Sequence, residues 1–144
     1  MIEIKKITAE QTYAIRLEIL RKGINKPYQF DGDFDQETFH LGAFVENELV
    51  GVSTFVKNNS NLFSEVNQYQ LRGMATLHKV RGKGVGVKLL NTSIGELKKM
   101  KTTILWCNAR EVALGFYSKL NFKIIGEKFM VDQIGNHYLM YLSI

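Results

Sequence analysis

One short stretch of the sequence is dense in both glycine and positive charge. In RGKGVG, residues 81–86, Gly82, Gly84 and Gly86 are interspersed with Arg81 and Lys83. A strand-like segment precedes the stretch, and a segment with helical spacing follows it. The first amides of a helix lack carbonyl partners and lie at the positive end of the helix dipole, and glycine lets an anion approach them closely. These residues therefore predict a phosphate-binding turn.

The glycine spacing distinguishes among three phosphate-binding patterns. The P-loop needs Gly-Lys followed by Ser or Thr, which does not occur here. The dinucleotide fingerprint G-x-G-x-x-G needs a third glycine at the position of Val87. The pattern R/Q-x-x-G-x-G/A is matched by Arg81, Gly84 and Gly86. Taken alone, these residues also fit a surface turn that begins an ordinary amphipathic helix.

A second motif follows about twenty residues later. In LWCNAREVALGFYSKLNFK, an asparagine ends a strand-like run and the pattern A-x-x-F-Y-x-K-x-G-F follows, with Asn121 in place of its glycine. Asn121 is a mild departure, because asparagine also tolerates the left-handed conformation that ends a helix. The two motifs together resemble the GNAT superfamily of acyl-CoA-dependent N-acetyltransferases. The segments PYQFDGDFDQETFHLGAF, LRGMATL and HYLM are similar to a bacterial branch of that superfamily related to ElaA.

This resemblance implies a cosubstrate, acetyl-CoA, and a place for it. In the family, acetyl-CoA lies in a V-shaped gap between two splayed strands, which would here be residues 70–77 and 103–107. The backbone groups of the first strand would contact the pantetheine arm, Asn108 would reach it from the second strand, and the glycine turn would hold the pyrophosphate. The expected cofactor-binding residues are Met74, Ala75, Thr76, Arg81, Gly82, Lys83, Gly84, Val85, Gly86, Val87 and Asn108.

The resemblance also suggests how protons move during acetyl transfer. An amine must lose its proton before it attacks, and a lysine-like amine has a pKa of ~10.4, so the site needs a base. His137 is the first candidate, because an ordinary histidine titrates near neutrality, although a strand-edge histidine with local hydrogen bonds fits as well. Glu65, Glu127 and Asp132 are the other candidates. Tyr117 occupies the family position that donates a proton to the departing thiolate, and it could instead be core packing.

Other reactive side chains have simpler interpretations. Cys107 lies in an apolar run without a neighbouring histidine in the sequence, which favours a buried, inert thiol over a covalent nucleophile. Asp31, Asp33 and Asp35 lie in one acidic segment, which could attract a cationic amine or simply be a solvated loop. The three histidines are far apart and have no metal-ligand spacing, so no metal is expected.

The elements that must position these residues follow a β-α-β-β-β-α-β-α-β-β order. We expect strands at 2–7, 38–45, 49–57, 67–79, 102–109, 122–131 and 137–144, and helices at 10–22, from 85 onward and at 110–120. Thr8 and Gln11 form a capping-box pattern, and Gly73 in the middle of a strand predicts a bulge. Hairpins mixed with crossovers indicate an α/β (α+β) class with a mixed, mostly antiparallel twisted sheet flanked by helices.

Composition narrows the remaining choices. The 144 residues are 45% hydrophobic and carry a net charge of +5, which fits a single domain spanning 1–144. No signal peptide or membrane-spanning run is present, and the lone cysteine fits a reducing compartment, so we expect a cytoplasmic protein without a membrane partner. The acceptor would be a small-molecule or peptide amine, which the sequence does not identify. The C-terminal strand could either pair across a homodimer or fill the sheet.

Two functions are alternatives to acetyl transfer. One is a non-catalytic acyl-CoA-binding module. The other is a nucleic-acid-binding protein, which has weaker support from ELKKMK, and we expect no nucleic-acid partner.

Overall fold

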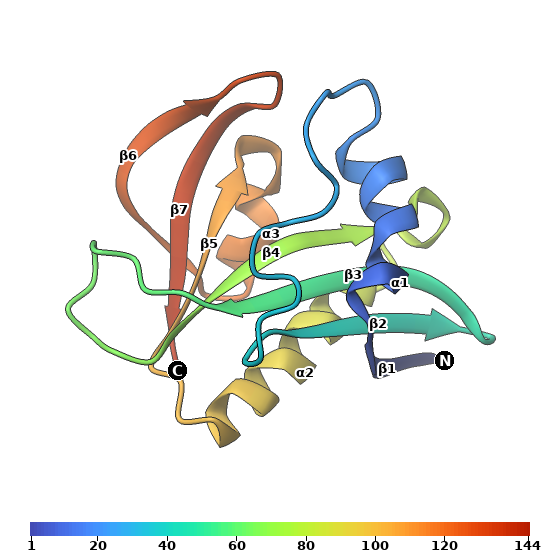
Figure 1. The fold of residues 1–144 in the computed structure, drawn as a ribbon, viewed down its shortest axis with the longest axis horizontal. Helices are drawn as coiled ribbons and strands as arrows, with labels where there is room; N and C mark the ends of the chain where they lie inside the picture. Colours follow the sequence, from blue (N-terminus) through green and yellow to red (C-terminus); the bar gives the residue numbers. More distant parts are fainter.

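A computed structural model describes all residues, 1–144. The protein consists of one seven-stranded sheet flanked by helices (Figure 1). The strand order is β1-β2-β3-β4-β5-β7-β6, and only the β4–β5 pair is parallel. The predicted mixed, mostly antiparallel sheet is therefore confirmed. The strands are β1 (Ile2–Ile7), β2 (Phe39–Val45), β3 (Glu48–Lys57), β4 (Gln68–Thr76), β5 (Ile104–Arg110), β6 (Lys123–Val131) and β7 (Gly135–Ser143).

Helices cover both faces of this sheet (Figure 1). The α1 helix (Ala9–Ile15) continues into the π-helix η1 (Arg16–Leu20) on one face, and α2 (Val85–Lys99) and α3 (Leu114–Lys119) lie on the other. Two short 3₁₀ segments, η2 (His78–Val80) and η3 (Glu111–Ala113), lead into α2 and α3. The main apolar core lies between the sheet and α2, where Leu89, Leu90 and Leu97 are fully buried.

Several local signals in the sequence form the structures that they predict. The hydroxyl of Thr8 accepts from the Gln11 amide at 3.2 Å, and the Thr8 amide donates to the Gln11 side chain at 2.8 Å, so the capping box is complete. Glu46 and Asn47, both with positive φ, make the tight turn between β2 and β3. Asn121 ends α3 with φ +71°, as expected for a left-handed helix terminator.

Other elements differ from the sequence-based predictions. The helix predicted at 10–22 changes to π geometry at Arg16, whose side chain is completely buried and bonded to other elements. The strand predicted at 67–79 ends at Thr76, because the chain turns into η2. In the segment predicted as a helix at 110–120, the first residue still belongs to β5 and the next three form the 3₁₀ turn η3, so the α-helix itself is α3. The C-terminal strand β7 fills the sheet between β5 and β6, so it has no free edge for pairing across a dimer.

The junction between β4 and β5 opens along its length. Their pairing covers only Gln68 with Ile104, Tyr69 with Leu105 and Gln70 with Trp106. Beyond that point β4 remains paired with β3, and β5 remains paired with β7. The two strands therefore diverge in the middle of the sheet, in the V shape that the resemblance implies.

Candidate functional site

The divergence of β4 and β5 opens a cleft of about 470 Å³. Backbone and side chains of both strands line it, from Gln70 to Met74 on β4 and from Cys107 to Arg110 on β5. Tyr117 lines it from α3, which lies on one face of the sheet. The segment from Leu20 to Asp31 and the β6–β7 hairpin line it too. The cleft therefore has two ends, one toward α3 and one toward the loop after η1.

A β-bulge shapes the β4 wall of this cleft. Gly73 has φ +61°, and the ladder shifts so that Gly73 and Met74 together oppose one residue of β3, Ser53. This confirms the bulge predicted at Gly73. A Cβ at Gly73 would lie 2.7 Å from the ring of Phe30, so the close approach that the glycine permits is made by Phe30 of the same chain.

The glycine turn lies outside the cleft, beyond the end of β4. Gly84 caps α2 with φ +82° and offers no side-chain hydrogen bond, so the amides of Val85, Gly86 and Val87 in the first helical turn remain available. The amide of Lys83 is already used, because it donates to the carbonyl of Val80 at 3.2 Å. The turn is therefore an open helix N-terminus without a side-chain cap, which is suited to an anion.

Two residues of the turn motif serve the fold as well. Val85 is buried in the main core, so only its backbone faces the turn. Gly86 lies against α3, since a Cβ there would be 3.0 Å from the ring of Phe116. Arg81 and Lys83 are exposed on either side of Gly82 and are free to meet a ligand.

Tyr117 and Cys107 lie together at the α3 end of the cleft. Burial, and then the neighbouring Cys107 thiol, raises the pKa of Tyr117 well above its ordinary value. Burial raises the pKa of Cys107 to about 12, although the hydroxyl of Tyr117 partly opposes this shift. Both groups are therefore neutral at pH 7. The thiol is buried and inert toward acylation, as predicted, whereas Tyr117 is a protonated phenol at a cleft wall.

Tyr117 also belongs to the core. Its ring centroid lies 5.1 Å from that of Phe116 and 5.3 Å from that of Phe122. The ring is buried in the apolar cluster, as the core-packing alternative predicts, and the same residue lines the cleft.

Of the four candidate bases, the structure brings only His137 to the cleft. Its Nδ1 lies 2.8 Å from the carbonyl oxygen of Gly135, and its ring stacks on Phe129 with 5.6 Å between the centroids. A carbonyl can only accept, so Nδ1 carries a hydrogen, and in the neutral form of the ring the lone pair is on Nε2. Glu65, Glu127 and Asp132 do not line the cleft.

The other predicted cofactor residues are divided between the cleft and the sheet. Met74 and Asn108 line the cleft from opposite strands. Ala75 is buried against Ile15 and Val52 on the face toward α1, and Thr76 is likewise not part of the cleft lining. Of the residues 74–76 that were predicted to contact the pantetheine arm, only Met74 lines the cleft.

Asp33 of the acidic segment neither lies in a solvated loop nor is free to attract a cationic amine. That carboxylate is buried and receives two hydrogen bonds from Arg16, at 2.8 and 2.9 Å, so it is not part of a solvated loop. Burial alone would raise the pKa of Asp33, but the hydrogen bonds from Arg16 and from the Phe30 amide lower it below the ordinary value. The pair holds the loop after η1 against the sheet, because Arg16 also donates to the Tyr28 carbonyl and to Thr54.

Four basic side chains line the other end of the cleft: Arg21, Lys26, Arg72 and Arg110, with a single carboxylate, Asp31, among the lining residues. The sequence analysis missed this group. Its members come from η1, the following loop, β4 and β5, and no spacing in the sequence connects them. The only available signal was the excess of Lys and Arg over Asp and Glu.

No group of three His, Cys, Asp or Glu side chains is arranged to hold a metal ion. None of the helices has the length and apolar character needed to cross a bilayer.

Comparisons with known proteins agree with this geometry. The profile of the family described as "Acetyltransferase (GNAT) family" matches residues 5–122. YitI of Bacillus subtilis (strain 168), an uncharacterized N-acetyltransferase, is 37% identical over 145 residues, which covers 100% of this chain and 97% of YitI.

Two of the solved structures that share the fold serve as examples. Escherichia coli ElaA has a TM-score of 0.79 and 18% identity, over 98% of this chain and 99% of ElaA. An aminoglycoside 6'-N-acetyltransferase complexed with coenzyme A has a TM-score of 0.78 and 13% identity, over 98% of this chain and 96% of that one.

Proposed function

Because this chain belongs to the acetyltransferase (GNAT) family of acyltransferases, we propose that it transfers an acetyl group from acetyl-CoA to a primary amine in the cleft between β4 and β5. The observation that carries the proposal is the divergence of these strands after Gln70 and Trp106. It opens the sheet where Tyr117, the proton donor of this proposal, and His137, its base, line one cavity.

The open N-terminus of α2 fits a coenzyme A pyrophosphate. The amides of Val85, Gly86 and Val87 have no intrahelical partner, and Gly84 leaves the approach free of side chains. Arg81 adds full positive charge beside them. Met74 and Asn108 would then contact the pantetheine arm from the two strands. When bound, acetyl-CoA supplies an activated acyl group as a thioester.

Residues of the chain would accept and donate the protons of the reaction. His137 would accept the proton of the incoming ammonium at Nε2, because its Nδ1–H is committed to the Gly135 carbonyl. Tyr117 would donate a proton toward sulfur from a hydroxyl that burial keeps protonated. The two roles follow from the groups themselves, since an imidazole with a free Nε2 can accept a proton and the protonated phenol of Tyr117 can donate one.

The test is an acceptor screen with purified protein and acetyl-CoA. We expect thiol release above the rate of hydrolysis for at least one class of primary amine, with a product heavier by one acetyl group. Binding of acetyl-CoA without any acetylated product across small amines and peptides would instead identify a binding module that does not turn over. Failure to bind acetyl-CoA at all would remove the proposal.

A further inference from the structure

The basic end of the cleft has more arginines than carboxylates, and its arginines form no ion pairs. Arg21, Arg72 and Arg110 are each only partly exposed, and none of them takes part in an ion pair. Arg16, by contrast, is matched by Asp33 at 2.8 Å. Three guanidinium groups are therefore gathered around a single lining carboxylate, Asp31, which forms an ion pair with none of them.

The hydrogen bonds of these arginines go to backbone carbonyls. Arg110 donates to the Leu20 carbonyl at 3.1 Å, and Arg21 donates to Pro27 and Leu20 carbonyls at 2.8 and 3.2 Å. Arg72 has one hydrogen bond, to the carbonyl of Asp31, at the long distance of 3.5 Å. Arg72 is therefore the arginine with the most unused donor capacity.

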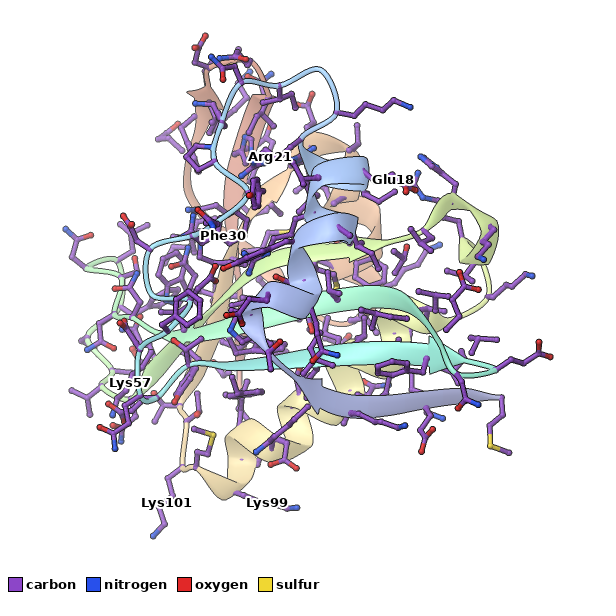
Figure 2. The ribbon with its side chains drawn as sticks, turned by 45° about the vertical axis from the view of Figure 1, so that its right-hand side comes forward. Glu18, Arg21, Phe30, Lys57, Lys99 and Lys101 are labelled. Atoms are coloured by element: carbon purple, nitrogen blue, oxygen red, sulfur yellow. The ribbon has the colours of Figure 1, made fainter.

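Phe30 brings two of the arginines together. The guanidinium carbon of Arg72 lies 4.6 Å from the Phe30 ring centroid, and that of Arg21 lies 5.4 Å from it. Figure 2 shows Arg21 and Phe30 next to each other at the loop after η1. Burial lowers the pKa of Arg21, and the nearby Arg110 and then Arg72 lower it further, as expected for like charges held close together.

We propose that this cluster binds an anionic group of the acceptor, so that the substrate is a primary amine that also carries a carboxylate or a phosphate. Either anion could accept paired hydrogen bonds from the planar guanidinium of Arg72. Arg72 directly precedes the Gly73 bulge and Met74, so the anion would be held beside the wall where the acyl group is expected. The amine end would then lie between the arginines and His137. This inference rests on the proposed acetyl transfer.

The cationic cleft also bears on one of the two alternatives that the sequence left open for the acidic segment. The acidic segment could have attracted a positively charged amine. In the structure Asp33 is neutralised by Arg16, and Asp31 is the only carboxylate in the cleft lining. A polyamine would bring further positive charge to this end of the cleft, whereas an amino acid or an aminoalkyl phosphate would balance it.

The experiment compares acceptors that differ only in their charged end. The probes are γ-aminobutyrate, its neutral amide γ-aminobutyramide, putrescine and aminopropyl phosphate, each with saturating acetyl-CoA. We expect kcat/KM for the carboxylate or the phosphate probe to exceed that for the amide by about 10-fold to 100-fold, the size of one hydrogen bond to a charged group. The better of the two anions identifies the group. An amide or putrescine that reacts as well as both anions would overturn the inference.

Variants locate the effect at the cluster. Arg72→Gln should abolish the preference for the anionic probe, mainly through KM, and Arg72→Lys should keep part of it because the charge remains without the planar fork. Lys101→Gln makes the same change in net charge at the opposite end of the molecule and should keep the full preference (Figure 2). A preference that survives Arg72→Gln in correctly folded protein would contradict the assignment.

Failure of acetyl transfer is separable from failure of this inference. If no amine is acetylated, calorimetry with the same probes and coenzyme A-saturated protein decides. Binding of an anionic probe about 10-fold or more tighter than the amide, lost in Arg72→Gln, supports the anion site, and equal binding overturns it.

Discussion

Removing the charge of Arg16 should destabilise the protein more than breaking any of its exposed ion pairs. The Arg16 side chain is fully buried, and its guanidinium bonds to the Tyr28 carbonyl, both Asp33 oxygens and the Thr54 hydroxyl, at 2.8–2.9 Å. In Arg16→Met, Asp33 keeps only the Phe30 amide as a partner and becomes an uncompensated buried charge. Breaking such a pair from one side costs about 3–5 kcal/mol.

Urea unfolding measures this loss. With a slope of about 2 kcal/mol per molar urea, the midpoint should fall by about 1.5–2.5 M. The double variant Arg16→Met with Asp33→Asn removes the stranded charge and should regain at least about 1 kcal/mol. Lys57→Met is the matched control. It breaks the exposed pair with Glu37, 3.2 Å apart, and should cost no more than about 1 kcal/mol.

Two results would refute this reasoning. One is a loss for Arg16→Met as small as that for Lys57→Met. The other is a double variant whose loss is the simple sum of the two single losses, since that would mean the charges are not coupled. Because the pair fixes the loop that carries Phe30, we also expect Arg16→Met to weaken acceptor binding.

Two further predictions concern pH and helix packing. Burial lowers the pKa of His40, which accepts from Thr54 at Nδ1 and donates to the Asp33 carbonyl from Nε2. His40 therefore takes up a proton at a higher pH in the unfolded state than in the folded state. The free energy of unfolding, measured by urea titration, should fall as the pH drops below about 6.5, by at most about 1.4 kcal/mol per pH unit. A flat wild-type profile, or an equal slope in His40→Gln, would argue against this prediction. Gly95 in α2 has open space around it, so Gly95→Ala should raise the free energy of unfolding by about 0.5–1 kcal/mol. Gly86→Ala should show no such gain, because the added methyl group would meet the ring of Phe116. Equal gains for the two variants in thermal unfolding would contradict this packing.

Local patterns carried most of the fold. The capping box at Thr8 and Gln11, the bulge at Gly73 and the left-handed Asn121 each depend on a few neighbouring residues, so their spacing in the sequence was sufficient. The strand–turn–helix around Gly84 is local in the same way. Of these features, the turn at Gly84 and the helix end at Asn121 lie within the two family motifs, which explains why the family could be predicted from the sequence.

The acceptor end of the cleft could not be predicted in this way. Arg21, Arg72 and Arg110 come from distant parts of the chain and meet only because β4 and β5 diverge beneath the loop after η1. Asp33 was misjudged for the same reason, since its partner Arg16 lies in a helix 17 residues earlier. The π-helical turn at Arg16 accompanies this pairing, and helical periodicity gives no sign of it.

The role of Tyr117 tests the central claim of acetyl transfer most directly. The measurement is the rate of thiol release at saturating acetyl-CoA and amine by the wild-type protein and by Tyr117→Phe, with acetyl-CoA affinity measured for both by calorimetry. Tyr138→Phe, a tyrosine outside the cleft lining, is the control. We predict that Tyr117→Phe lowers kcat by about 10²-fold or more while acetyl-CoA affinity changes little, because the hydroxyl supplies a proton to the leaving group. An unchanged kcat in Tyr117→Phe would contradict the assignment of the chemistry to this end of the cleft.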